Sequence, residues 1–279
     1  MAITNIPEIF SPILLEALNS RLAYSALFNQ DYQGSVTYGN KVNILSLDPV
    51  TVGNYVVDTP IDYQLLSDSK QELDINQQKY FAISLDDIDE IQSNADLMGA
   101  MARNASYQLQ KTIDGFLATT ASAGAGIVSG LGTTSVPLAI NSANVKKTLL
   151  TIGRKMDEAL VPRAGRVIIV PPWFVEKIVL AGILEATNNS EMLLNGYAGR
   201  YGGFDIYMAT NVPNTTGAKW QILAGTSIAG TMAVQLSKVE TIRLETHFAD
   251  ALRGLAVYGS KITRPTTLAK AICDEAAEV

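Results

Sequence analysis

Residues 93–120, SNADLMGAMARNASYQLQKTIDGFLATT, carry the longest helical pattern in the chain. An apolar or small residue recurs at every fourth position: Leu97, Met101, Ala105, Leu109, Ile113 and Leu117. This spacing predicts one amphipathic helix over 94–120, with Ser93 or Asn94 as its N-cap. At about 1.5 Å per residue, the helix would be roughly 40 Å long. We therefore predict that it is the axis of the subunit, with sheets packed against it.

The sequence after this helix predicts a compact α/β unit. Residues 118–132 are rich in Gly, Ala, Ser and Thr, which predicts that the helix gives way to a mobile loop. A second helix is expected over 141–161, capped by Asn141 or Ser142 and stopped by Pro162. Further along we expect a buried strand (166–170), a helix opened by Pro171-Pro172, strands at 203–209 and 220–225, a helix-like segment at 226–236, β runs at 239–248 and 253–265, and a polar tail.

The sequence before the helix predicts an arm followed by a long β excursion. Residues 1–30 contain Pro7 and Pro12 and one short amphipathic helix, which must dock on something to be stable. Residues 31–85 predict strands, including a hairpin around Gly39-Asn40 and strands at 42–47, 55–57 and 73–85. Since this region has too few large apolar residues to bury itself, we expect it to borrow a core from a neighbouring molecule.

Composition narrows the functional classes. Hydrophobic residues make up 47% of the 279 residues, which excludes wholesale disorder. No apolar run approaches the roughly 18 residues that span a bilayer, and the N-terminal sequence does not resemble a secretion signal. A single cysteine, Cys273, cannot form an internal disulfide, which favours cytosolic synthesis. The net charge of −6 argues against a protein that grips nucleic acid.

The charges are unevenly distributed. Residues 62–90 contain eight acidic side chains and two lysines, whereas residues 146–166 contain six basic side chains beside Asp157 and Glu158. The two segments are either solvated faces or complementary patches that meet between subunits, where charge would set the register of the contact.

Residue combinations that carry chemistry are sparse. His247 is the single histidine, so a two-histidine metal site is impossible, and neither a GxSxG elbow nor a GxxxxGK[ST] loop is present. The segment GAGIVSG (124–130) lacks the spacing of a dinucleotide fingerprint and follows a helix rather than a strand. The acidic run LDDIDE (85–90) lacks the glycine and spacing of a calcium loop. We therefore predict no catalytic, cofactor-binding or metal-binding residues.

Several segments, taken in order, resemble one known family. LFNQDYQGSVTYGNKVNILSL (27–47) and QSNADLMGAMARNASYQLQKTIDGFLA (92–118) resemble the extended loop and the spine helix of tailed-bacteriophage major capsid proteins of the Hong Kong 97-type fold. VPRAGRVIIVPPWFVEKI (161–178) resembles the passage into the axial domain of that fold. GGFDIYMATNVP (202–213) and VETIRLETHFADALRGLAVYGSKITRP (239–265) resemble its later strands and its return to the peripheral domain.

The resemblance implies an α+β fold and a shell-forming role without enzymatic activity or cofactors. The implied regions are an N-terminal arm (1–30), an extended β loop (31–85), a peripheral domain (86–165) with spine helix 94–120, an axial domain (166–238), and a return to the peripheral domain with a C-terminal tail (239–279).

The implied partners are further copies of the chain, forming the pentamers and hexamers of an icosahedral virion shell that encloses double-stranded DNA without sequence-specific binding. The shell would be synthesised and assembled in the bacterial cytoplasm, with no membrane partner. The short segment before the loop implies a separate scaffolding protein, and a portal protein is also expected. Some relatives are crosslinked through a loop lysine. Lys41, Lys70 and Lys79 are candidates by position only, and nothing marks a catalytic glutamate, so the sequence does not tell whether this shell is crosslinked.

Two alternatives stay open at this stage. An encapsulin-like compartment would have the same fold but would form without a scaffolding partner and hold protein instead of DNA. An α/β enzyme would have to use His247 or the acidic run at 85–90.

Overall fold

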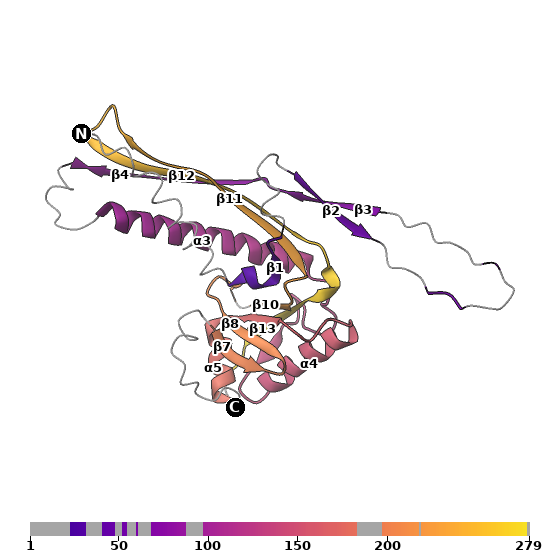
Figure 1. Cartoon of the computed structure of the whole chain (residues 1–279). Helices are drawn as coiled ribbons and strands as arrows, with labels where there is room; N and C mark the ends of the chain where they lie inside the picture. The colour runs from indigo at the N-terminus through magenta and orange to yellow at the C-terminus, as the bar shows by residue number, and fades with distance from the viewer. Residues whose placement is uncertain are drawn as a thin grey trace.

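The computed structural model describes residues 23–31, 41–47, 52–54, 60, 68–87, 97–182, 197–217 and 219–277. Its elements form an elongated helix-and-sheet layer above a compact α/β body, with a two-stranded hairpin projecting from the side (Figure 1). None of the described helices combines the length and apolarity needed to cross a membrane.

The elongated layer is built on helix α3 (Leu97–Gly124), whose 28 residues extend for about 42 Å. The predicted apolar row is confirmed from Ala105 onward, because Ala105, Leu109, Ile113 and Leu117 are all buried, whereas Met101 is half-buried. The helix continues past residue 120 and ends at Gly124, so the expected loop begins later than predicted. The small residues Ala118 and Ala121 lie in the core, which explains why they belong to the helix.

A four-stranded sheet lies along α3. Its order is β1 (Phe28–Asn29), β11 (Gly230–Arg243), β12 (Ala249–Ile262) and β4 (Gln77–Asp86), antiparallel except for β1 with β11. Leu252, Ala256 and Tyr258 of β12 share a core with the buried row of α3.

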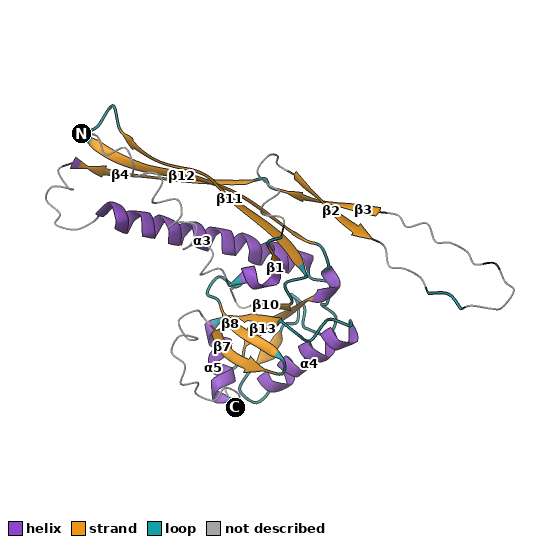
Figure 2. Ribbon diagram, viewed as in Figure 1, coloured by secondary structure: helices purple, strands orange, loops and turns teal. Residues whose placement is uncertain are grey.

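The compact body contains a mixed seven-stranded sheet with helices α4 (Val145–Glu158) and α5 (Pro172–Leu180) (Figure 2). One sheet face packs with α4 and α5, and the other contributes Val167, Ile169 and Leu223 to the core shared with α3. The sheet order is β5 (Leu138–Ile140), β13 (Leu268–Glu275), β10 (Lys219–Gly225), β6 (Arg166–Val170), β8 (Phe204–Met208) and β7 (Tyr197–Tyr201), with β9 (Asn214–Thr215) on β10.

Two predicted elements are wrong. The helix-like segment 226–236 is a turn followed by the start of β11, because pairing with β12 from Gly230 to Arg243 outweighs the local helical pattern. The expected polar tail contains strand β13, which pairs with both β10 and β5 and buries Cys273. In addition, α4 begins at Val145 with Asn144 in the N-cap position, later than the caps predicted at Asn141 or Ser142.

The projecting hairpin consists of β2 (Lys41–Leu47) and β3 (Asp68–Asp74), paired in antiparallel register from Lys41–Asp74 to Leu47–Asp68. It extends beyond the end of the helix-and-sheet layer (Figure 2). The strand predicted at 42–47 is confirmed within one residue, whereas the one predicted at 55–57 and the turn around Gly39-Asn40 lie outside the described residues.

Candidate assembly surfaces

The residues that could have supported catalysis do not come together. His247 is exposed in the β11–β12 connection, and its Nδ1 lies 2.9 Å from the Thr246 hydroxyl. Burial raises the pKa of the Cys273 thiol to about 12, so this thiol is protonated at neutral pH. In the acidic run, Asp87 is bound by Arg243, and that hydrogen bond lowers the pKa of Asp87.

The other candidate groups also have structural surroundings. Among the described residues, no cluster of three or more His, Cys, Asp or Glu side chains could hold a metal ion. The segment 124–130 starts at the C-terminus of α3, and Ile127 then bridges to Ala269 of β13. Lys41 lies 2.8 Å from Glu72 and 3.4 Å from Asp74, Lys79 is exposed on β4, and the side chain of Lys70 lies outside the described residues.

The base of the projecting hairpin packs on the four-stranded sheet through a small apolar cluster. Its buried members are Ile44, Leu73, Ile75 and Ala233, with Val257 beside them. Ala233 of β11 pairs with Gly259 of β12. A Cβ added at Gly259 would lie 2.2 Å from the Asp74 carbonyl oxygen and 2.9 Å from the Ile75 Cα. The missing side chain therefore lets the hairpin backbone lie directly on the sheet.

One edge of the four-stranded sheet is formed by β4 among the described strands. Strand β4 is the terminal strand of that sheet, and no described strand pairs with its outer edge. A groove of about 320 Å³ lies between β4 and α3, lined by Phe81 and Ile83 of the strand and by Leu109 of the helix. Tyr80 is 81% exposed on the same strand. Proteins that act alone usually protect such an edge, so an open edge indicates a surface for another chain.

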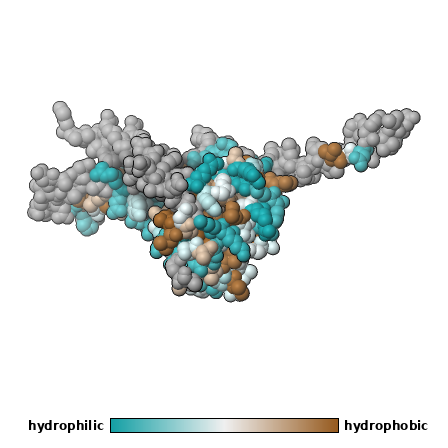
Figure 3. Space-filling view, turned by 90° about the horizontal axis from the view of Figure 1, so that it is seen from below, coloured by the Kyte–Doolittle hydropathy of each residue, from teal (hydrophilic) through white to brown (hydrophobic). Residues whose placement is uncertain are grey.

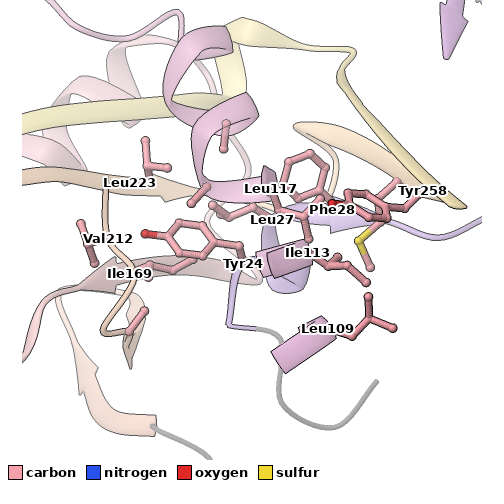
Figure 4. Packing of buried hydrophobic residues seen from close by; sticks show 14 of the residues in the cluster. Tyr24, Leu27, Phe28, Leu109, Ile113, Leu117, Ile169, Val212, Leu223 and Tyr258 are labelled. Atoms are coloured by element: carbon pink, nitrogen blue, oxygen red, sulfur yellow. The ribbon is translucent and has the colours of Figure 1, made fainter. Parts of the chain in front are cut away.

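A buried carboxylate joins three parts of the chain. The backbone N–H of Tyr24 donates to Asp114 Oδ1 at 3.0 Å, and Asn211 Nδ2 donates to Asp114 Oδ2 at 2.7 Å. Tyr24 belongs to the 3-10 helix η1 (Tyr24–Leu27), Asp114 to α3, and Asn211 to the compact body. Figure 4 shows Tyr24, Leu27 and Phe28 packed among side chains of both layers. This junction therefore fixes the compact body relative to the helix-and-sheet layer.

We expect Asp114 to make the stability of this junction depend on pH. Burial raises the pKa of Asp114 above its usual value, and the hydrogen bonds from Tyr24 and Asn211 oppose that shift only in part. The folded state thus holds the proton more tightly than the unfolded state. The Asp114 carboxyl therefore contributes stability below its unfolded pKa of 3.8. This contribution is lost as the pH rises through the raised pKa that Asp114 has in the folded state.

The test is Asp114→Asn, in which Asn211 can turn its amide to keep both hydrogen bonds. Denaturant unfolding from acid to neutral pH should show the variant gaining stability relative to the wild-type chain as the pH rises. A constant difference in unfolding free energy across that range would contradict this assignment.

Exposed apolar residues are dispersed over the described surface. Seen from below, the compact body displays hydrophobic and hydrophilic residues in alternation (Figure 3). The most exposed large apolar side chains lie outside helices and strands in separate parts of the chain, and include Val52, Phe248 and Leu160. Apolar side chains scattered singly are normal on a protein surface, so they mark no particular interface.

These features describe an elongated subunit with a projecting hairpin and a sheet edge, β4, that no described strand covers. The sequence model of the family described as phage capsid protein matches residues 69–271. The chain belongs to this family. It has the Hong Kong 97-type fold and is a major capsid protein of a tailed bacteriophage, which self-assembles into the icosahedral shell of the virion.

Solved structures support this assignment. The chain is similar to a structure from Mycobacterium phage Che8, with 25% identity, a TM-score of 0.72, and coverage of 90% of this chain and 91% of the other. It is also similar to the capsid of the cyanophage P-SCSP1u, with 13% identity, a TM-score of 0.67, and coverage of 86% of this chain and 85% of the other. A third similar structure is the capsid of Ralstonia phage GP4, with 13% identity, a TM-score of 0.66, and coverage of 93% of this chain and 91% of the other. No curated protein sequence matches the chain. The family match supports the capsid assignment over an encapsulin-like compartment.

Sequence reasoning missed the residues that join the parts. Asp114 lies beside Ile113 on the buried side of α3, so a charged residue next to an apolar row was the available signal. Gly259 and Asn211 carried no such signal, because their importance comes from residues far away in the sequence.

Proposed function

We propose that this capsid protein assembles in the bacterial host cytoplasm together with a separate scaffolding protein and a portal protein, and that its shell encloses double-stranded DNA without sequence-specific binding. We propose further that the subunit has no enzymatic activity. The net charge of −6 supports containment of DNA without tight binding.

We also propose a role for each structural region. The projecting hairpin β2–β3 is the extended loop, α3 with the four-stranded sheet is the peripheral domain, and the seven-stranded sheet with α5 is the axial domain. Because α4 packs in the core of the seven-stranded sheet, we assign it to the axial domain as well. The observation that carries the proposal is the hairpin, which packs on its own subunit only at its base in the described chain.

Electron microscopy of the recombinant protein, expressed alone and with the neighbouring phage genes, tests this function. We expect closed icosahedral shells or curved sheets, more uniform when the scaffolding partner is present. Deleting residues 35–75 should abolish shells and leave a soluble folded subunit. Intact shells from the deletion would contradict the role of the hairpin, and small uniform particles under every condition would contradict the assembly proposal.

The enzyme alternative has a separate test. If the purified protein shows an enzymatic activity, its loss in His247→Ala or Asp87→Ala would favour the enzyme, because these are the residues that an enzyme would have to use. Purified shells that contain host enzymes in place of DNA would instead favour the compartment.

A further inference from the structure

A pocket lined by three arginines lies on the compact body, beside the C-terminal half of α4. Its volume is about 410 Å³, and Arg154, Arg163 and Arg166 line it together with a single carboxylate, Asp157. The pocket therefore carries a surplus of positive charge, although the whole chain has a net charge of −6. Its remaining walls are small or apolar: Leu150, Gly153, Gly202 and Gly203.

The carboxylate in the pocket is shared by two guanidinium groups. Arg163 Nη2 donates to Asp157 Oδ2 at 2.8 Å, and Arg166 Nη2 donates to Asp157 Oδ1 at 2.7 Å. Arg166 is 3% exposed and also donates to the carbonyl oxygens of Val161 and Pro162, at 2.6 and 2.9 Å. Arg166 and Asp157 thus form the fixed floor of the pocket. Because one carboxylate balances the charge of only one of these two guanidinium groups, the positive charge of Arg163 is not neutralised by Asp157.

The other two arginines are positioned to take a further anion. The side chains of Arg163 and Arg154 are 81% and 66% exposed. Arg154 makes a single ion pair among the described residues, with Glu158 at 3.5 Å, and Lys155 shares that glutamate at 3.1 Å. Arg163 makes a paired contact with Asp157, through Nε at 3.3 Å and Nη2 at 2.8 Å, so its Nη1 and the exposed guanidinium of Arg154 are the donors that face an anion entering from outside.

We propose that this arginine pocket receives a side-chain carboxylate of a second copy of this chain when the shell assembles. The inference rests on the shell-forming function. Every neighbour has 27 acidic residues against 21 basic ones, so a second copy offers more carboxylates than cations. A single side chain fits a cavity of this size, with Leu150 and the two glycines at its wall. Contact with one DNA phosphate would add little affinity, since DNA binding requires many such contacts.

The test compares two double variants that remove the same charge. Arg154→Gln with Arg163→Gln empties the pocket wall and leaves the buried Arg166–Asp157 pair intact. Lys146→Gln with Lys147→Gln changes two exposed residues of the same helix that do not line the pocket. The threshold concentration for shell assembly is measured by light scattering and electron microscopy at low and high salt, with the scaffolding partner co-expressed if the wild-type chain requires it.

We expect the arginine variant to raise the assembly threshold about tenfold and to reduce its salt dependence, because one charged hydrogen-bonded contact per subunit is lost. The lysine variant should assemble as the wild-type chain does. An equal rise of the assembly threshold in both variants would show that only the total positive charge of the subunit matters, and would overturn the proposal. An unchanged threshold in both variants would overturn it as well. Loss of binding to a short DNA duplex with unchanged assembly would assign the pocket to phosphate instead.

A second measurement does not depend on assembly. Inorganic phosphate should raise the melting temperature of unassembled wild-type subunits more than chloride does at equal ionic strength, and the arginine variant should lose this difference. If shells never form but the phosphate effect is present, the shell function fails while the anion pocket stands. If shells form but the arginine variant responds to phosphate as the wild-type chain does, the pocket assignment fails.

Discussion

Replacing Gly259 with valine is expected to abolish shell formation. Atoms of a side chain at this position would overlap the backbone at Asp74 and Ile75, which cannot move aside as a flexible side chain could. The hairpin base would have to lift off the sheet and expose Leu73 and Ile75, both of which are buried. We expect a cost of about 3 kcal/mol in unfolding free energy, at the upper end for overpacking.

Thermal unfolding and electron microscopy check this result together. The matched control is Gly115→Ala in α3, where an added Cβ meets no atom within 4 Å. This control should assemble normally and gain about 0.5–1 kcal/mol from the better helix propensity of alanine. Wild-type shells from the Gly259→Val variant would show that the hairpin orientation does not govern assembly.

We expect Tyr24→Ala to lower the unfolding free energy strongly and Tyr24→Phe not to lower it. Tyr24 is fully buried where α3 meets the compact body, and its hydroxyl has no hydrogen-bond partner among the described residues. Tyr24→Ala leaves a cavity among Ile169, Val212 and Leu223 (Figure 4), so it should cost about 3–5 kcal/mol. Tyr24→Phe removes an unsatisfied buried polar group and should be neutral or stabilising by about 1 kcal/mol.

Denaturant unfolding of the unassembled subunit measures both substitutions. The phenylalanine variant is the control, because it keeps the ring and the backbone N–H that donates to Asp114. A loss of more than about 1 kcal/mol in the phenylalanine variant would show that the hydroxyl makes a stabilising hydrogen bond. A cost below about 1 kcal/mol for Tyr24→Ala would show that the junction can refill the cavity and is loosely packed.

The main helix and the central strand of the compact body could be predicted from sequence, because their signals are local. The four-residue spacing from Ala105 to Leu117 defines one buried side of α3, and the short run Arg166–Val170 forms β6, which is buried throughout. Both patterns lie within single continuous segments, so a window of neighbouring residues contains the information.

Only the tertiary structure decided the elements and contacts that depend on distant partners. Residues 230–236 have a helical local pattern but form the start of β11, because the antiparallel strand β12 pairs with them. Likewise, β13 is a strand because β10 and β5 lie on either side of it. The same applies to Asp114 and Asn211, which are 97 residues apart in the sequence and meet only in the folded chain. Local spacing determines which face of an element is buried, whereas packing between elements determines what that face meets.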